Sequence, residues 1–365
     1  MKIIYWVWGV MIGLELKGAV AQNVDSLQQD QKEAKKITII PAPVLYYTPE
    51  TRWAYGIAAT SAFRFKGDSA NARPSQVSLS AVYTQERQYL FYSQFQLFPH
   101  NAKYFFYGEM GYFRYAYNFF GIGEEEVPKE QFVADYPRIR LNFMQKISPS
   151  MYGGFRYQFE DFKLIKTQPN GVLTSGDIPG TPRSVSSGFG LGLLYDTRDK
   201  VFFPTKGIFA DLAFLHFTPT LGSHFRFDRF SADISAYQKL APKVVLAGNL
   251  FSSFTLGSPP FNMMSELGGG RRLRGYYLAH FRDDHALLLQ SELRFGIFRR
   301  LGGVVFGSSG ILGSQGTGFR FNEPRSSYGA GLRFTANRRE HLNVRFDYAM
   351  GKDISNFYFT IGEAF

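Results

Sequence analysis

The clearest indication of the fold class lies near the C-terminus, where the sequence reads Leu342-Asn343-Val344-Arg345-Phe346-Asp347-Tyr348-Ala349-Met350. Apolar side chains occupy the even-numbered positions of this stretch, and polar or small side chains occupy the odd-numbered ones. A period of two is that of a β-strand, whose successive side chains point to opposite faces. Residues 287–297 repeat the pattern, with Gln290, Glu292 and Arg294 on the polar face. We expect both segments to be barrel strands that present their apolar face to lipid and their polar face to the lumen.

Composition supports a β-rich protein. The 365 residues include 17% aromatic side chains, 37 glycines and no cysteine. The lack of cysteine excludes disulfide frameworks, thiol nucleophiles and Cys-ligated zinc. No internal apolar run reaches the length of about 18 residues that a transmembrane helix needs, which excludes a helical membrane bundle. A soluble β-protein or a transmembrane β-barrel remains.

The lengths of the segments and their connectors favour the barrel. About 16 alternating segments start near residues 37, 52, 74, 88, 102, 133, 150, 184, 207, 223, 242, 284, 300, 325, 341 and 354. Short connectors are expected at residues 98–101, 148–150, 241–243 and 338–340, and long ones at 116–132, 163–183, 257–283 and 311–324. Short turns on one side and long loops on the other are typical of outer-membrane barrels. We therefore predict an all-β fold, a transmembrane antiparallel β-barrel of about 16 strands with both termini in the periplasm.

The N-terminal segment predicts secretion. Lys2 precedes the apolar stretch 3–14, and Ala19-Val20-Ala21 has the small-x-small pattern of a cleavage site. A short membrane anchor is the alternative. We expect residues 1–21 to be a signal peptide, 22–36 a polar periplasmic tether too hydrophilic to pack, and 37–365 the barrel in the outer membrane of a Gram-negative bacterium.

The formal net charge of +11 does not indicate nucleic-acid binding, because the basic residues are scattered through the alternating segments and form no stripe or known module. Arginines and lysines that line a lumen and pair with inward carboxylates, or that contact anionic lipid head groups at its rim, explain the charge of a barrel better. We expect outer-membrane lipids as partners, no nucleic acid and no cofactor.

A glycine-rich connector contains the most informative motif. Residues 266–277 include Leu273-Arg274-Gly275-Tyr276, in the loop before the twelfth segment. A hairpin of this kind can fold into a wide lumen, where the planar guanidinium of Arg274 can pair with an inward carboxylate. This motif resembles the Arg-Gly-aromatic motif of the sixth extracellular loop in the BamA/TamA superfamily of outer-membrane insertases and translocators, also called bacterial surface antigens.

A second match lies between the eighth and ninth segments. Residues 195–207 contain Asp196, Arg198 and Asp199, followed by Pro204 and Gly207. This order resembles the family's turn motif of Asp-x-Arg-Asp followed by Pro-x-x-Gly. The carboxylates and the arginine can brace a periplasmic turn, while proline and glycine shape its backbone.

The resemblance implies several site residues. Arg274, Gly275 and Tyr276 would form a loop lock with Glu292 on the inner wall. At a second position the family usually has an aspartate, and this chain has Ser308, so the lock is weaker there or Asp347 substitutes for it. The C-terminal strand, with Phe357, Phe359 and the final Phe365 expected on one face, resembles the signal that the assembly machinery recognises in its clients; Glu363 is an off-pattern charge expected at the membrane interface.

The resemblance also implies a function: assisting the insertion or translocation of proteins, or of lipids, with no catalytic site. Members that assemble other barrels carry periplasmic POTRA domains, and about 15 tether residues are too few to form one. We expect the barrel-intrinsic mechanism, a weak seam between the first and last strands of a monomer, with a separate periplasmic partner as one possibility.

Two other functions stay open. A passive or gated channel is compatible with a barrel of this size. An outer-membrane hydrolase is less well supported: residues 280–285 place Asp284 and His285 at the outer rim, where they could activate water or bind a metal, but no serine nucleophile is positioned beside them. We expect no enzyme activity.

Overall fold

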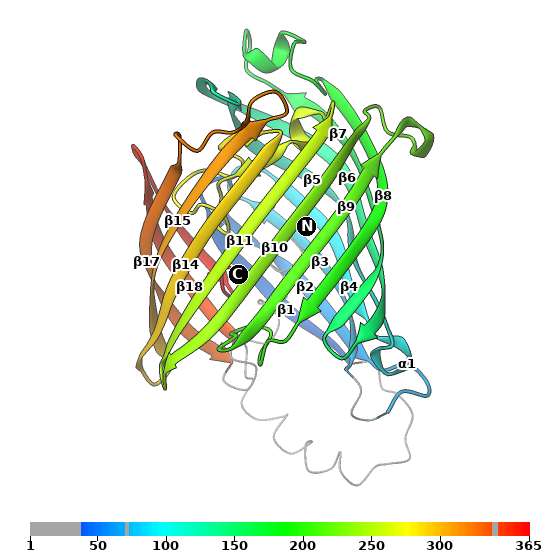
Figure 1. Cartoon of the computed structure of the whole chain (residues 1–365), viewed down its shortest axis with the longest axis vertical. Coiled ribbons are helices and arrows are strands. Elements are labelled where there is room, and N and C mark those ends of the chain that lie inside the picture. The colour runs from blue at the N-terminus through cyan, green and yellow to red at the C-terminus, as the bar shows by residue number, and fades with distance from the viewer. Residues whose placement is uncertain (1–37, 70–72, 338–341) are drawn as a thin grey trace.

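The computed structural model describes residues 38–69, 73–337 and 342–365 (Figure 1). The predicted signal peptide, tether and turn at 338–340 lie outside these residues. No helix within the described ranges is long and apolar enough to cross a membrane.

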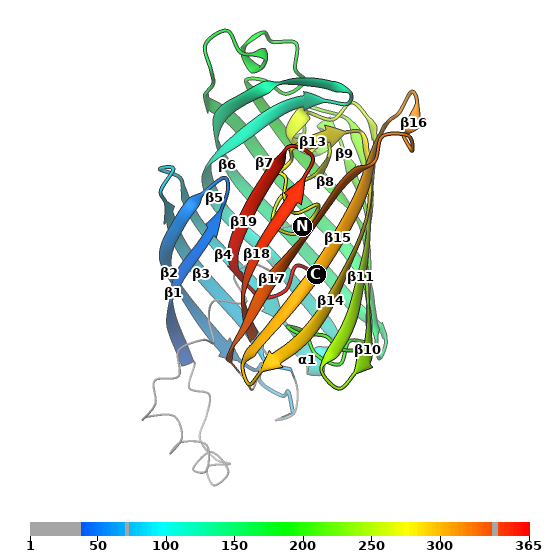
Figure 2. The ribbon, with the colours of Figure 1, turned by 90° about the vertical axis from the view of Figure 1, so that its left-hand side faces the viewer.

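Sixteen long antiparallel strands form a closed barrel, as predicted (Figures 1 and 2). They are β1 (Thr38–Thr48), β2 (Arg52–Phe63), β3 (Ser75–Thr84), β4 (Tyr89–Leu97), β5 (Tyr104–Ile122), β6 (Glu125–Ser148), β7 (Met151–Lys166), β8 (Arg183–Asp196), β9 (Gly207–Phe217), β10 (Phe227–Ala241), β11 (Val244–Gly257), β14 (His285–Phe298), β15 (Leu301–Ser314), β17 (Arg325–Asn337), β18 (Leu342–Gly351) and β19 (Ile354–Ile361). The connectors contain α1 (Pro99–Ala102), η2 (Val172–Thr174), η3 (Pro219–Leu221), η4 (Phe261–Met263), β12 (Ser265–Leu267), β13 (Phe281–Asp283) and β16 (Gly318–Phe319). Each long strand pairs with the long strand next to it in the sequence, and β1 and β19 meet where the barrel closes.

The two-residue alternation sorts side chains between lipid and lumen. In β18, Phe346 and Tyr348 are exposed on the outer face, whereas Arg345 and Asp347 are buried on the inner face. Leu342 departs from the pattern: it is fully buried at the end of β18, beside a shift in the β17–β18 register. In β14, Leu289 is exposed while Glu292 is buried, as the sequence pattern predicts.

One predicted loop is instead a strand hairpin. Residues 116–132 continue β5 and β6 to a turn at 123–124, so β6 starts at Glu125 and not near 133. Phe119 and Phe132 are almost fully buried there, with ring centroids 5.9 and 5.8 Å from that of Phe261. Because these rings pack on a segment that folds inward from elsewhere in the chain, the strands extend past the expected loop boundary.

The long connector between β11 and β14, which we call the lumen loop (residues 258–284), packs against the inner wall. Its small β12–β13 sheet and its apolar side chains form a cluster with residues of the wall strands. The buried members are Phe251, Leu267, Leu273, Tyr276, Phe281, Ala286, Leu288 and Leu312. The barrel therefore has a packed interior on this side.

Candidate functional site

The arginine motif of the lumen loop lies in a backbone that requires glycine. Leu273 and Gly275, on either side of Arg274, have φ values of +51° and +107°. A Cβ atom on Gly275 would lie 3.0 Å from the carbonyl carbon of Met350 in β18. The tight approach of this turn to the wall carries Arg274 into the lumen.

Arg274 is fully buried and contacts two carboxylates. It donates from Nη2 to Glu292 Oε1 at 2.5 Å and from Nη1 to Asp347 Oδ2 at 2.7 Å. Its guanidinium also lies 3.4 Å from the ring centroid of Phe306. Ser308, in contrast, contacts Gln290 at 3.4 Å. Of the two residues considered for the second position, Asp347 is the one in contact with Arg274.

Arg274 belongs to a larger group of buried ions that we call the ion cluster: Arg274, Glu292, Arg294, Arg333, Arg345, Asp347 and Glu363. Arg294 donates to Glu292 at 2.7 Å, and Arg333 donates to Asp347 at 2.5 Å. The expectation of Glu363 at the membrane interface is wrong, because Glu363 accepts from Arg333 at 2.7 Å and its side chain is 3% exposed. The alternation of side chains along β17 and β18 could have placed Arg333 and Arg345 on the inner face. It could not have predicted which acids these arginines contact.

Gly275 and Tyr276 attach the lumen loop to the last two strands. Tyr358 of β19 accepts from the N–H of Gly275 at 3.1 Å and donates to the carbonyl of Tyr276 at 3.1 Å. The Tyr276 hydroxyl accepts from the N–H of Lys352 at 2.8 Å. Asn356 donates to the carbonyl of Gly275 at 2.7 Å. The motif thus fixes the loop to β19 through hydrogen bonds of backbone groups, and to β14 and β18 through the ion pairs of Arg274.

The loop also reaches the other side of the barrel closure. The carboxylate of Glu50, in the turn between β1 and β2, accepts from the N–H of Leu278 at 2.6 Å. Burial raises the pKa of Glu50, an effect that this hydrogen bond opposes. Sequence reasoning missed Glu50, because a single carboxylate in a turn carries no distinguishing pattern.

The closure between β1 and β19, which we call the seam, has little backbone pairing. Every residue of β1 from Thr38 to Thr48 pairs with β2. Among the described residues, one pair joins β1 to β19, formed by Tyr47 and Phe359. Aromatic side chains cover this contact: the rings of Tyr47 and Phe357 stack with centroids 4.1 Å apart. The barrel is therefore closed at the seam mainly by side chains.

The predicted turn motif lies between β8 and β9. Arg198 forms a bidentate pair with Asp196 at 2.9 and 2.8 Å. Asp199 accepts from the backbone N–H of Thr205 at 2.8 Å. Burial acts to raise the pKa of Asp199, but the hydrogen bonds from Thr205 and Lys206 outweigh it and leave the pKa lowered.

The backbone of this turn also depends on its glycine. Gly207 has a φ of +102°, and a Cβ atom there would lie 2.3 Å from the carbonyl oxygen of Thr197. Pro204, which precedes it in the motif, is buried. The motif residues thus brace one connector at the end of the barrel opposite the lumen loop.

The C-terminal residues do not keep to one face. Phe357 is exposed on the outer surface and Phe359 partly so. After β19 the chain turns at Gly362, whose φ is +84°, and the ring centroid of Phe365 lies 5.4 Å from the guanidinium of the buried Arg294. The expected common face of the three phenylalanines is therefore wrong for Phe365, because Gly362 and the Glu363–Arg333 pair direct the chain end inward.

The residues considered for hydrolysis each contact different neighbours, aromatic rings or a backbone N–H group. His280 stacks on Phe120 with centroids 3.8 Å apart, and His285 lies 5.4 Å from Phe254. Asp284 accepts from the backbone N–H of Gln315 at 3.0 Å. Within residues 38–69, 73–337 and 342–365, no group of three or more His, Asp or Glu side chains is arranged to hold a metal ion.

Comparison with solved structures shows the same fold in bacterial barrels. BamA from Haemophilus ducreyi lacking POTRA domains 1-3 matches with a TM-score of 0.66 at 15% identity, over 90% of this chain and 70% of that one. CdiB from Acinetobacter baumannii matches with a TM-score of 0.60 at 14% identity, over 90% and 60%. CdiB from Escherichia coli matches with a TM-score of 0.62 at 12% identity, over 90% of this chain and 63% of that one. This chain therefore spans less than two thirds of the length of either CdiB.

A search of curated proteins finds no match to this chain. The model of the Omp85 superfamily domain, however, matches residues 76–365, which hold β3 to β19. This match covers the wall strands from β3 onward, the arginine motif of the lumen loop and the turn motif between β8 and β9. The chain belongs to the Omp85 superfamily.

Proposed function

We propose that this barrel assists the insertion of proteins into the outer membrane of a Gram-negative bacterium, or their translocation across it, by opening laterally at the seam. The observation that carries the proposal is that, within the part of the chain that the structure describes, one backbone pair, Tyr47 with Phe359, joins β1 to β19. A strand with an unpaired edge is a template on which a strand of an incoming protein can form hydrogen bonds. Clients would be outer-membrane or exported proteins, and a separate periplasmic partner would deliver them.

The lumen loop would control this opening as a lock, formed by Arg274, Gly275, Tyr276 and Glu292, with Asp347 as the second acid. In the closed state the loop contacts β19 through Tyr358 and the β1–β2 turn through Glu50. Opening the seam would separate these two anchors. The loop and the seam would then respond together to a client.

The test uses the absence of native cysteines in the sequence. We would introduce Tyr47→Cys with Phe359→Cys, which pair across the seam, and measure the folding rate of an unrelated outer-membrane barrel in liposomes that contain the purified protein. We expect acceleration by the reduced protein, loss of acceleration after oxidation, and recovery after reduction.

A matched control crosslinks two strands that are fully paired. Leu79→Cys with Ser93→Cys joins β3 to β4 on the outer face, and its oxidation should leave the acceleration unchanged. If the seam crosslink did not change the rate, lateral opening would be excluded. If the reduced protein gave no acceleration but conducted ions steadily, a channel would be the better description.

A further inference from the structure

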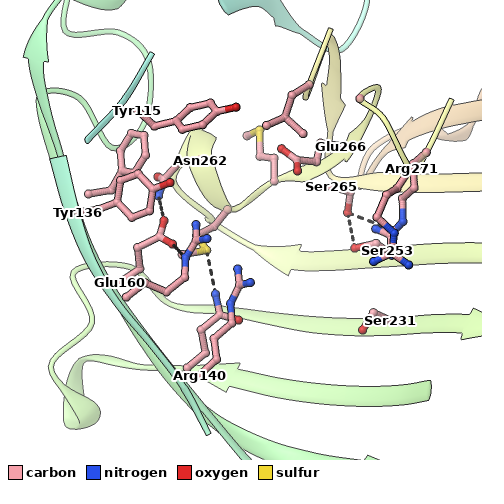
Figure 3. A pocket seen from close by; sticks show the side chains of 18 of the residues that line it. Tyr115, Tyr136, Arg140, Glu160, Ser231, Ser253, Asn262, Ser265, Glu266 and Arg271 are labelled. Carbon is pink, nitrogen blue, oxygen red and sulfur yellow. Dashed lines mark hydrogen bonds and ion pairs between the residues drawn. The ribbon is translucent and has the colours of Figure 1, made fainter. Parts of the chain in front are cut away.

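A cavity of about 340 Å³ lies between the inner wall and the lumen loop. Its wall side carries Arg140 and Glu160, and its loop side carries Ser265, Glu266 and Arg271 (Figure 3). A cavity of this volume is in the range of small-molecule sites.

Positive charge exceeds negative charge among the side chains that line this cavity. Seven arginines face five carboxylates, namely Arg138, Arg140, Arg156, Arg229, Arg271, Arg272 and Arg282 against Glu50, Glu160, Asp211, Asp233 and Glu266. The cavity thus has a formal excess of two positive charges. Buried charge without compensation is costly, so a bound anion would stabilise this arrangement.

Most of the carboxylates are already bound to other groups. Glu160 accepts from Arg138 at 2.6 Å and from Asn262 at 3.0 Å. Asp211 accepts from Arg156 at 2.5 Å. Asp233 accepts from Arg272 at 2.7 Å and from Asn249 at 2.7 Å, and Glu50 accepts from Leu278. Four of the five acids are therefore engaged by partners other than the remaining arginines.

Among the cavity arginines that no carboxylate named above engages, Arg140, Arg229 and Arg282 keep buried N–H groups without a hydrogen-bond partner within the described residues. These groups are Nε and Nη1 of Arg140, Nη2 of Arg229, and Nε and Nη1 of Arg282. Arg282 is only 5% exposed. All three arginines line the same cavity, together with Glu160 and Glu266. They come from β6, β10 and β13, which places donors on the wall and on the loop.

Part of the cavity wall is aromatic. Tyr115, Tyr117, Phe132, Tyr136, Phe162 and Phe261 line it and belong to one packed cluster. The guanidinium of Arg282 lies 5.1 Å from the ring centroid of Phe261, so the donors and the aromatic surface adjoin. A ligand that fits both surfaces has an anionic group and an apolar body.

We propose that this cavity binds a small phosphate monoester with an apolar body, whose phosphate is held by Arg140, Arg229 and Arg282. A phosphate monoester carries a charge of about −1.5 to −2 at neutral pH, which matches the excess. Guanidinium groups suit phosphate because their forked donors form paired hydrogen bonds with its oxygens. Since the donors lie on wall and loop, the bound phosphate connects the two. This inference does not depend on the proposed function.

The test is a calorimetric titration of the purified full chain in nonionic detergent with phenyl phosphate as the probe. We expect one binding site, weaker binding of inorganic phosphate, and no binding of phenol. Arg140→Gln and Arg282→Gln should each weaken phenyl phosphate binding roughly tenfold or more, since each removes a charge-assisted donor. Arg183→Gln is the matched control, because Arg183 is exposed and pairs with Asp161 outside the cavity. This variant should bind phenyl phosphate as tightly as the wild-type protein does.

Heat modification on gels verifies that each variant is a folded barrel. Arg282→Lys is a milder variant, because it keeps the positive charge but cannot form the paired hydrogen bonds of a guanidinium group. The proposal is overturned if folded wild-type protein does not bind phenyl phosphate, or if Arg140→Gln and Arg282→Gln bind it as tightly as wild type. Phosphatidylcholine vesicles with and without phosphatidic acid identify the source. Loss of phenyl phosphate binding in phosphatidic acid vesicles assigns the site to a lipid phosphate, and retention assigns it to a soluble monoester.

Discussion

At the scale of single residues, the acids of the ion cluster are shared between arginines: Glu292 and Asp347 each accept from two of them. Arg274, Arg294, Arg333 and Arg345 face Glu292, Asp347 and Glu363. Glu292 accepts from both Arg274 and Arg294, so its removal leaves two guanidinium groups without this acceptor. After removal of Arg274, Glu292 still accepts from Arg294. The two partners of one ion pair should therefore differ in their importance for stability.

We predict that Glu292→Ala lowers the stability of the barrel strongly and that Arg274→Ala lowers it less. Breaking a buried ion pair costs about 3–5 kcal/mol when an uncompensated charge is left behind, as it is after loss of Glu292. Both variants should release the lumen loop to proteases, because both remove the Arg274–Glu292 contact. Heat-modification midpoints and limited proteolysis measure the two effects. Equal midpoints for the two variants, or a loop as protected as in wild type, would contradict the prediction.

The sequence predicted the residues of this cluster better than their pairing. The alternation of β14 and β18 placed Glu292 and Asp347 on the inner face, and the loop motif identified Arg274. Arg333 and Glu363 were missed as a pair, since their contact depends on a chain end that turns at Gly362. Such contacts depend on strand register and chain direction, which no local pattern contains.

At the scale of elements, strand starts were predicted closely where apolar residues alternate across the lipid layer. The largest departure is β6, which begins at Glu125 because the β5–β6 hairpin is held by packing on the lumen loop. His280 belongs to the same contact region, stacked on Phe120 of β5. The docking of the loop thus involves an imidazole, the ring of His280.

We predict that loop docking weakens as the pH falls from 6.5 towards 4. Burial, with a smaller effect from Arg325, lowers the pKa of His280 from 6.5 to about 4. Between pH 6.5 and about 4, His280 therefore binds a proton in the released loop but not in the docked loop. The free energy of docking becomes less favourable as the pH falls through this range. Above pH 6.5 the contribution is fully present.

Proteolysis of the loop across this pH range, with an acid-tolerant protease, measures the effect. The raised pKa of Glu50 acts in the opposite direction, so the series is best recorded in a Glu50→Gln background, which keeps an acceptor for Leu278. His280→Phe, which retains the stacking surface, should flatten the pH dependence. A profile unchanged by His280→Phe would assign the effect to other groups.

At the scale of the whole molecule, the sequence could not predict how the barrel closes at the seam between β1 and β19. An even set of alternating segments predicts closure, but the extent of pairing between the first and last strands depends on the curvature and stagger of all the others. At the seam, Tyr47 of β1 stacks on Phe357 of β19, and Trp53 of β2 lies beside Phe359 of β19, where a backbone ladder would otherwise continue. Each aromatic pair contributes about 0.5–1.5 kcal/mol beyond its burial, so these contacts are a substantial part of what holds the seam.

We predict that the seam is the most readily opened part of the wall. In hydrogen–deuterium exchange of the protein in lipid nanodiscs, peptides from β1 and β19 should exchange faster than peptides from β10 and β11, which pair along their whole length. Tyr47→Ala should accelerate exchange in β1 and β19 further by removing the aromatic contacts. Tyr55→Ala is the matched control: Tyr55 is an exposed ring on the outer face of β2, opposite Tyr83 of β3, and its loss should leave exchange at the seam unchanged. Exchange in β1 as slow as in β10, or equal responses to the two variants, would show that side chains close the barrel as firmly as a backbone ladder does and would remove the basis for lateral opening.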